Sequence, residues 1–125
     1  MKKRDSLPDG ELEIMQQVWD LEPPVARCEI ERRLAEAGRL RKPSTITTFL
    51  TRLNERGFLD VEHRGKTNYY TPRITRREYL AQESRSVLDR LCGGSLSMFA
   101  AALCDGGVSR EELDELRRLL EEGKL

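Results

Sequence analysis

The sequence predicts a mainly α-helical fold that carries one β-hairpin. Three observations indicate it: apolar residues recur at helical spacing in separate blocks of the 125-residue chain, the pattern changes to alternation after residue 57, and helical spacing returns towards the C-terminus. No internal repeat or low-complexity tract is present. We therefore expect one domain at residues 7–73 and a further helical region at residues 74–125.

Two short helices are predicted before residue 39. The first begins near Asp9 and ends at the EPP sequence that starts at Glu22, because proline cannot continue a helix and also restricts the residue before it. Its apolar side chains share one face: Leu12, Met15, Val18 and Trp19. The second extends from about Ala26 to Gly38, since glycine is typical of the end of a helix. Its apolar side chains are Ile30, Leu34 and Ala37.

The third helix, predicted from Pro43 to Gly57, has two contrasting faces. Proline suits its first turn, where a missing N–H would be unpaired anyway. The apolar face repeats at i, i+3, i+4 and i+7: Ile46, Phe49, Leu50 and Leu53. The other face carries short hydroxyl groups, with Thr45 and Arg52 on its flank: Ser44, Thr47, Thr48 and Thr51.

Serine and threonine are weak helix formers, so this hydroxyl face calls for a reason other than helix stability. Short hydroxyl side chains let a helix approach a DNA groove closely, donate to phosphates or base edges, and present methyl groups to thymine. The alternative is that these threonines are capping and surface residues. The face therefore indicates a DNA-binding helix without establishing one.

Alternating apolar and acidic residues over Leu59–Glu62 predict a strand after the third helix. A turn at Arg64–Lys66 leads to a second strand over residues 67–71. The result is a hairpin with a basic tip. Three helices followed by a hairpin is the element order of a winged helix-turn-helix domain, in which the third helix enters the major groove and the hairpin lies along the DNA backbone.

Charge is distributed unevenly along the chain, although the formal net charge is zero. Residues 39–73 contain eight Lys and Arg against three Asp and Glu, whereas residues 1–38 contain six against nine and residues 74–125 eight against ten. A basic middle third suits a surface that faces phosphate groups. An ordinary uneven surface would give the same counts.

The C-terminal third is predicted to form further helices. Thr75 and Ser109 each precede a glutamate by three residues, which is the pattern of a capping box. The Gly93–Ser95 sequence separates them and allows a short apolar helix at Leu96–Leu103. The last helix carries a stripe of leucines: Leu113, Leu116, Leu119 and Leu120. A second chain is expected to bury these stripes, the alternative being that they fold back onto the N-terminal domain.

The residue inventory indicates neither an enzyme nor a metal or cofactor protein. His63, the only histidine, lies in the predicted hairpin with no nucleophile at a useful spacing, and no glycine-rich phosphate loop or H-E-x-x-H pair occurs. Cys28, Cys92 and Cys104 have no C-x-x-C spacing, so buried, reduced thiols are expected. A soft-metal site at Cys92 and Cys104 is the alternative.

No apolar run is long enough to cross a membrane, and the charged N-terminal sequence does not resemble a signal peptide. A cytoplasmic protein without a membrane partner is therefore expected.

Several motifs closely resemble the penicillinase-repressor family, which is also called the BlaI/MecI/CopY family. They are the run from Pro43 to Leu59, the G-K-x-x-x-Y-x-P pattern that starts at Gly65, and ELEIMQQVW, which starts at Glu11. The resemblance continues through the segment VSREELDELRRLLEE, which ends at Glu122. It covers nearly the whole chain.

The resemblance implies a homodimeric transcriptional repressor that binds a palindromic operator in double-stranded DNA through two winged helices. The reading positions of the family map onto the third helix, and those of the wing onto the hairpin tip. With Thr51 from the same hydroxyl face, the expected DNA-binding residues are Ser44, Thr45, Thr47, Thr48, Thr51, Arg52, Arg64 and Lys66. A winged-helix module that binds only proteins is the alternative.

Induction is where the sequence departs from the family. In the β-lactam-responsive members a membrane sensor-protease triggers cleavage of an Asn-Phe bond, whereas the aligned pair here is Ala101 and Ala102. Cleavage with the same specificity is therefore not expected, although a different sensor-protease could cut nearby. The C-x-C cysteine pairs of the copper-responsive members do not occur in this sequence.

Overall fold

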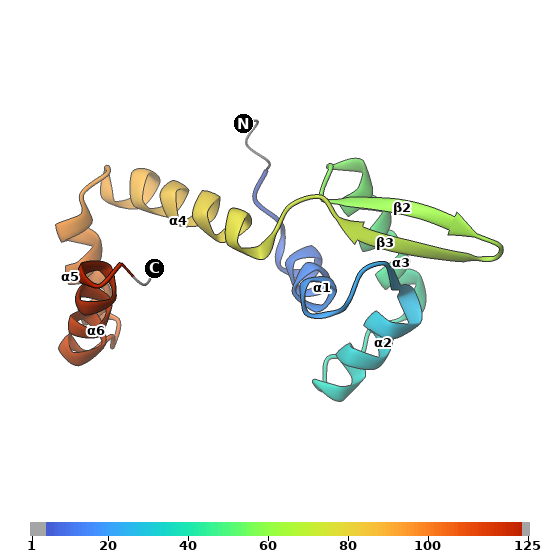
Figure 1. Cartoon of the computed structure of the whole chain (residues 1–125), viewed down its shortest axis with the longest axis horizontal. Helices are drawn as coiled ribbons and strands as arrows, with labels where there is room; N and C mark the ends of the chain where they lie inside the picture. The colour runs from blue at the N-terminus through green and yellow to red at the C-terminus, as the bar shows by residue number, and fades with distance from the viewer. Residues whose placement is uncertain (1–4, 124–125) are drawn as a thin grey trace. The chain divides into compact units, whose positions relative to one another are not determined.

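The computed structural model describes residues 5–123 and, within them, contains six α-helices and three β-strands. The chain divides into two compact units, the first reaching Gln82 and the second starting at Glu83. In chain order the elements are α1 (Asp9–Asp20), β1 (Val25–Ala26), α2 (Arg27–Glu36), α3 (Pro43–Glu55), β2 (Leu59–Arg64), β3 (Thr67–Pro72), α4 (Arg76–Cys92), α5 (Leu96–Asp105) and α6 (Arg110–Glu121) (Figure 1).

The first unit combines α1, α2 and α3 with a three-stranded antiparallel sheet of order β1-β3-β2. The predicted hairpin is confirmed, with Leu59 paired to Pro72 at its base and Arg64 paired to Thr67 beside the turn. Strand β1 was not predicted. It consists of two residues that pair with Tyr69 and Tyr70 of β3. So short a strand depends on its partner and leaves no alternating pattern in the sequence.

The apolar faces of the three helices meet the sheet in one core. Met15 and Val18 of α1 are buried as predicted, whereas Leu12 and Trp19 are only partly buried. Ala37, which was predicted among the apolar side chains of the second helix, is exposed because α2 ends at Glu36, one residue before it. The side chains that are almost completely buried are Ile14, Met15, Val18, Val25, Ile30, Leu34, Ile46, Leu50, Leu53, Phe58 and Leu59.

Helix α1 holds α3 in place at both ends. Glu11 and Glu13 of α1 are buried, and they pair with Arg56 and Arg41 at 2.9 Å each. Arg41 lies just before α3 and Arg56 just after it. The helical pattern alone would have placed both glutamates in solvent. Their burial fixes α3 against α1, since a buried carboxylate is stable only with its partner in position.

A glycine lets the same two helices approach closely. A Cβ atom at Gly10 would lie 2.8 Å from Cζ of Phe49, a distance that side chains do not tolerate. The ring of Phe49 is only partly buried, and it packs against the core at the position that Gly10 leaves open. The apolar face predicted for the third helix therefore contacts α1 directly.

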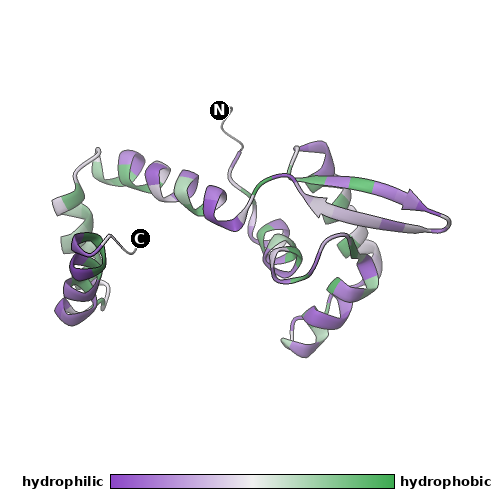
Figure 2. Ribbon diagram, in the orientation of Figure 1, coloured by the Kyte–Doolittle hydropathy of each residue, from purple (hydrophilic) through white to green (hydrophobic). Residues whose placement is uncertain are grey.

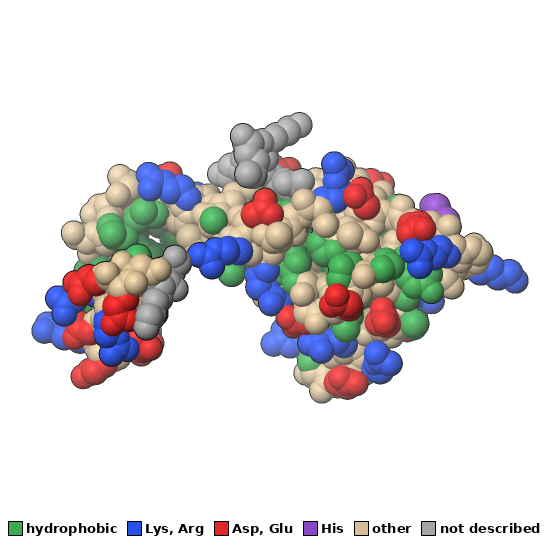
Figure 3. All heavy atoms as spheres, in the orientation of Figure 1, with side chains coloured by type: hydrophobic (Ala, Val, Ile, Leu, Met, Phe, Trp, Pro, Cys, Tyr) green, Lys and Arg blue, Asp and Glu red, His purple; other side chains and the backbone are tan. Residues whose placement is uncertain are grey.

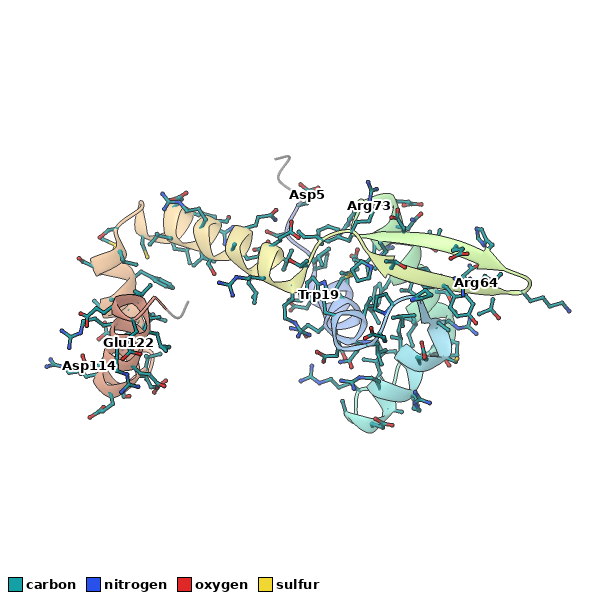
Figure 4. The ribbon with its side chains drawn as sticks, in the orientation of Figure 1. Asp5, Trp19, Arg64, Arg73, Asp114 and Glu122 are labelled. Atoms are coloured by element: carbon teal, nitrogen blue, oxygen red, sulfur yellow. The ribbon has the colours of Figure 1, made fainter. Side chains whose placement is uncertain are left out.

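The start of α4 belongs to the first unit. The indole N–H of Trp19 donates to the Ile74 carbonyl oxygen at 2.9 Å, and the Leu7 N–H donates to the Tyr79 hydroxyl at 2.8 Å. Arg76 pairs with Asp20 at 2.6 Å, and its guanidinium lies over the Trp19 ring. Trp19 of α1, labelled in Figure 4, therefore packs against the first turn of α4.

The second unit contains the rest of α4 with α5 and α6. The predicted capping box at Ser109 is confirmed, and so is the one that opens α4 at Thr75. Gly93 and Gly94 have φ angles of +57° and +82°, which glycine adopts without steric cost, and they separate α4 from α5. The predicted apolar helix is confirmed and extends two residues further, to Asp105.

No residue between Glu83 and Gly123 is buried in a single copy of the chain. Figure 2 shows α5 as largely apolar and α6 as a mixture of apolar and polar residues. Large apolar side chains remain exposed on all three helices of this unit: Leu91, Leu96, Met98, Leu116 and Leu120. Among the described residues, no single helix is long and apolar enough to cross a membrane, and only α4 and α5 taken together across a 92° bend meet that criterion.

Candidate nucleic-acid interface

Helix α3 presents the hydroxyl face to solvent while its apolar face is buried. Ser44, Thr47, Thr48 and Thr51 are exposed, and Thr45 is half-buried on the flank. Arg52 is exposed beside them. On the opposite side, three apolar residues of the predicted face are completely buried: Ile46, Leu50 and Leu53. The structure therefore separates the two faces as the periodicity predicted.

The hydroxyl groups on this face differ in what they can offer a ligand. Thr48 donates its hydroxyl hydrogen to the Ser44 carbonyl at 2.9 Å, and Thr51 donates to the Thr47 carbonyl at 3.0 Å. A hydroxyl has one hydrogen, so Thr48 and Thr51 retain only acceptor capacity and their methyl groups. Thr47 differs because its oxygen accepts a hydrogen bond from Arg27 at 3.2 Å, which leaves its own hydrogen available.

These polarities suit base edges in a major groove. An acceptor hydroxyl matches the amino group of adenine or cytosine, a donor hydroxyl matches N7 or a carbonyl oxygen, and a methyl group packs on thymine. Thr47 is therefore suited to an acceptor on the DNA, whereas Thr48 and Thr51 are suited to a donor or a methyl group.

The hairpin carries its two predicted cations in different states. Arg64, labelled in Figure 4, donates to both carboxylate oxygens of Glu62 at 3.1 Å and lies 4.9 Å above the Tyr69 ring. This hydrogen-bonded pair lowers the pKa of the Glu62 carboxyl group and raises the pKa of Arg64. Lys66 at the tip forms no ion pair with any residue of the described range 5–123. Basic side chains lie at this end of the hairpin, with an acidic side chain beside them (Figure 3).

A cleft of about 250 Å³ connects α3 to the hairpin. It brings together Thr47 and Lys66, which are both predicted site residues. Arg27 of α2 also lines it and was missed by the sequence reasoning. The only local sign of Arg27 was its spacing from Glu31, because its contact with Thr47 joins residues that are 20 positions apart. Arg52 and Arg64 lie outside the lining of this cleft.

The histidine and cysteines take ordinary positions. His63 shares a hydrogen bond with Asn68, its partner across the hairpin. The expectation of buried thiols is wrong for Cys28 and Cys104, which are exposed, and Cys92 is half-buried. Cys28 lies on α2 away from its buried residues Ile30 and Leu34, and Cys104 lies on α5, which has no buried residue in a single copy of the chain. Within residues 5–123, no group of three or more His, Cys, Asp or Glu is placed to hold a metal ion.

The three helices, the small antiparallel sheet and the exposed face of α3 define a winged helix-turn-helix protein. The chain belongs to the penicillinase repressor family, because the model of that family matches residues 7–122. This confirms the resemblance found in the sequence.

Two relatives and two solved structures support this assignment. The chain is 35% identical over 125 residues to the penicillinase repressor of Bacillus licheniformis. This alignment covers 99% of this chain and 96% of the relative. It is 31% identical over 117 residues, 93% of this chain and 79% of the relative, to an uncharacterised 16.5 kDa protein of Latilactobacillus sakei.

The solution structure of the DNA-binding domain of the repressor BlaI matches 63% of this chain and 94% of its own, with a TM-score of 0.53 and 33% identity. The monomeric form of Bacillus licheniformis BlaI, solved in complex with the blaP half-operator, matches over the same shares with a TM-score of 0.51 and 33% identity. These matches confirm the predicted fold.

Proposed function

We propose that this protein is a DNA-binding transcriptional repressor that acts as a homodimer on a palindromic operator. The observation that carries the proposal is the exposed hydroxyl face of α3, which lies beside a cleft shared with the basic hairpin. A similar winged domain, that of BlaI, was solved in complex with a half-operator. The cytoplasm is the compartment where such a protein would meet its DNA.

Helix α3 is the proposed reading element and the hairpin the proposed backbone contact. The full proposed set is the predicted one: Ser44, Thr45, Thr47, Thr48, Thr51, Arg52, Arg64 and Lys66. Lys66 forms no ion pair among residues 5–123 and so contributes its whole positive charge, whereas Glu62 offsets the charge of Arg64 in the free protein. Lys66 is therefore the stronger contributor to electrostatic attraction.

The second unit supports the proposed dimer. None of its described residues, 83–123, is buried in a single copy, yet leucines are exposed along α4, α5 and α6. An uncovered apolar surface on every element of a unit favours association, and identical chains associate most simply in a symmetric pair. A symmetric pair of winged domains would read two half-sites related by the same symmetry, which is why the proposed operator is palindromic.

The proposed induction step is proteolysis within the second unit, triggered by a sensor-protease. Ala101 and Ala102 are exposed on α5, so a protease with a preference for small residues would reach them once the helix opened locally. Cleavage there would separate α6 from the winged domain. The remaining fragment would lose part of the dimer surface and with it the joint binding of two half-sites.

A mobility-shift titration tests DNA binding. The full chain is titrated against its own upstream region and against an unrelated duplex at several salt concentrations. We expect a preference for the upstream region and a steep fall in affinity with salt. Lys66→Ala should weaken binding to both duplexes and reduce the salt slope by about 0.9 for each bound protomer. Failure of the wild-type chain to bind at low salt would refute the proposal and favour a protein-binding module.

A further inference from the structure

The cleft between α2, α3 and the hairpin contains a positive charge that the proposed DNA-binding set does not include. We infer that it is a subsite for one backbone phosphate of the duplex and that Arg27 is a positioning residue within it. The inference rests on the proposed function. It adds a contact that links the DNA backbone to the reading helix.

Three separate elements contribute to the cleft. Arg27 is the first residue of α2, Thr47 lies on α3, and Lys66 lies at the hairpin turn, and all three line the same volume of about 250 Å³. Two cationic side chains and a hydroxyl that face one open space form an environment suited to a phosphodiester. The acids of this region do not line the cleft.

Arg27 is held in place but retains donors. Its Nη1 donates to the Thr47 hydroxyl oxygen at 3.2 Å, and its Nε lies 2.9 Å from Glu31 Oε1. The buried Oε1 atom of Glu31 has no hydrogen-bond partner among the described residues, so its contact with Arg27 is an ion pair without a hydrogen bond. A guanidinium has five N–H donors in a rigid fork, so further donors remain for a phosphate. The side chain is 51% exposed and can be reached from solvent.

The Arg27 guanidinium therefore has two proposed roles, one towards the DNA backbone and one towards α3. Towards the DNA backbone it supplies positive charge beside Lys66, and a phosphate would compete with Glu31 for it. Towards α3 it keeps the Thr47 oxygen occupied as an acceptor, which directs the Thr47 hydrogen outward as a donor. Arg27 is therefore expected to link the position of the DNA backbone to the role of the Thr47 hydroxyl as a hydrogen-bond donor to the bases.

Fluorescence anisotropy with a duplex of the protein's own upstream region tests this inference on the full chain. Glu31 must be neutralised together with Arg27, because Arg27→Ala alone would leave a partly buried carboxylate without its ion-pair partner. The Arg27→Ala/Glu31→Gln variant should show a lower salt slope, by at most about 0.9 per bound protomer because Glu31 offsets part of the Arg27 charge, with the same loss on an unrelated duplex. Glu31→Gln alone should strengthen binding several-fold at low salt.

Two further variants separate charge from geometry. Arg32→Ala removes an exposed arginine from the same helix that does not line the cleft, and it should keep the wild-type salt slope. Arg27→Lys keeps the charge but lacks the planar fork, so it should retain the slope while relaxing the base preference at one operator position. Circular dichroism on each variant confirms that α2 and α3 remain folded.

Neutral methylphosphonates placed one at a time along the duplex locate the contact. At one phosphate per half-site the replacement should weaken wild-type binding and have no further effect on the Arg27→Ala/Glu31→Gln variant. An unchanged salt slope for that variant, or an equal loss for Arg32→Ala, would overturn the inference while leaving a salt-dependent, DNA-binding wild type. Failure of the wild-type chain to bind either duplex would instead overturn the proposed function.

Discussion

Replacement of Leu120 by alanine tests the proposed dimer most directly. Leu120 is 62% exposed on α6, one turn after the exposed Leu116. Complete burial of a leucine side chain stabilises by about 1.5–3 kcal/mol, so burial of the remaining 62% would contribute roughly 1–2 kcal/mol per copy. A symmetric dimer contains the residue twice. Alanine retains one methyl group, so we expect the loss of association free energy to be at the lower end of this range, about 2 kcal/mol per dimer. A loss of this size raises the dissociation constant roughly 30-fold.

Sedimentation equilibrium over a wide concentration range measures this change. The matched control is Leu40→Ala, because Leu40 is 70% exposed but lies in the connection between α2 and α3, outside the second unit. It should leave the dissociation constant unchanged. Circular dichroism verifies that α6 keeps its helicity, as alanine favours helix. The reasoning is wrong if Leu120→Ala dissociates no more readily than the wild type, or if Leu40→Ala has the same effect.

Three more substitutions probe the winged domain. Arg56→Ala leaves Glu11, which is 2% exposed, without its partner; we expect a loss of about 2–3 kcal/mol in the free energy of unfolding, less than for a wholly buried pair because the Arg56 side chain is 37% exposed. Urea denaturation followed by fluorescence of the single tryptophan measures it, and added Glu11→Gln should recover most of the loss. Thr48→Val keeps a methyl group but removes the acceptor, so binding-site selection should show relaxed preference at one operator position, by about 1–3 kcal/mol; an unchanged preference at every position would count against reading by this side chain. Glu62→Gln releases Arg64 from its ion pair and should strengthen DNA binding at low salt in a mobility-shift titration; equal affinity would show that the guanidinium does not face the duplex.

Local patterns were sufficient for the elements that carry the proposed interface. The two faces of α3, the alternation in β2 and the capping boxes at Thr75 and Ser109 involve residues within a few positions of one another. The stability of these features depends on local backbone geometry and on periodic burial, and both follow from the spacing of residue types along the chain. The predicted helices and hairpin are confirmed for this reason. The DNA-binding role of the individual side chains stays a prediction.

Other features had no local signal because their partners are distant in the chain. The bond between Glu11 and Arg56 spans 45 positions, and the one between Arg27 and Thr47 spans 20. Strand β1 exists only through its pairing with β3. A charged residue on a helix is ordinarily expected in solvent, so the burial of Glu11 becomes predictable only when its neighbour is known.

The sequence by itself determined the order of the helices and of the two hairpin strands, the family, and the presence of a hydroxyl-rich face on α3, because each of these depends on periodicity and motif spacing over short stretches. The tertiary structure decided which charges are paired and which remain available. It placed buried glutamates against the ends of α3, offset Arg64 with Glu62, and brought Arg27 and Lys66 to one cleft. Electrostatic interactions depend on distance in space and on burial, and neither quantity is encoded in the spacing of residues along the chain.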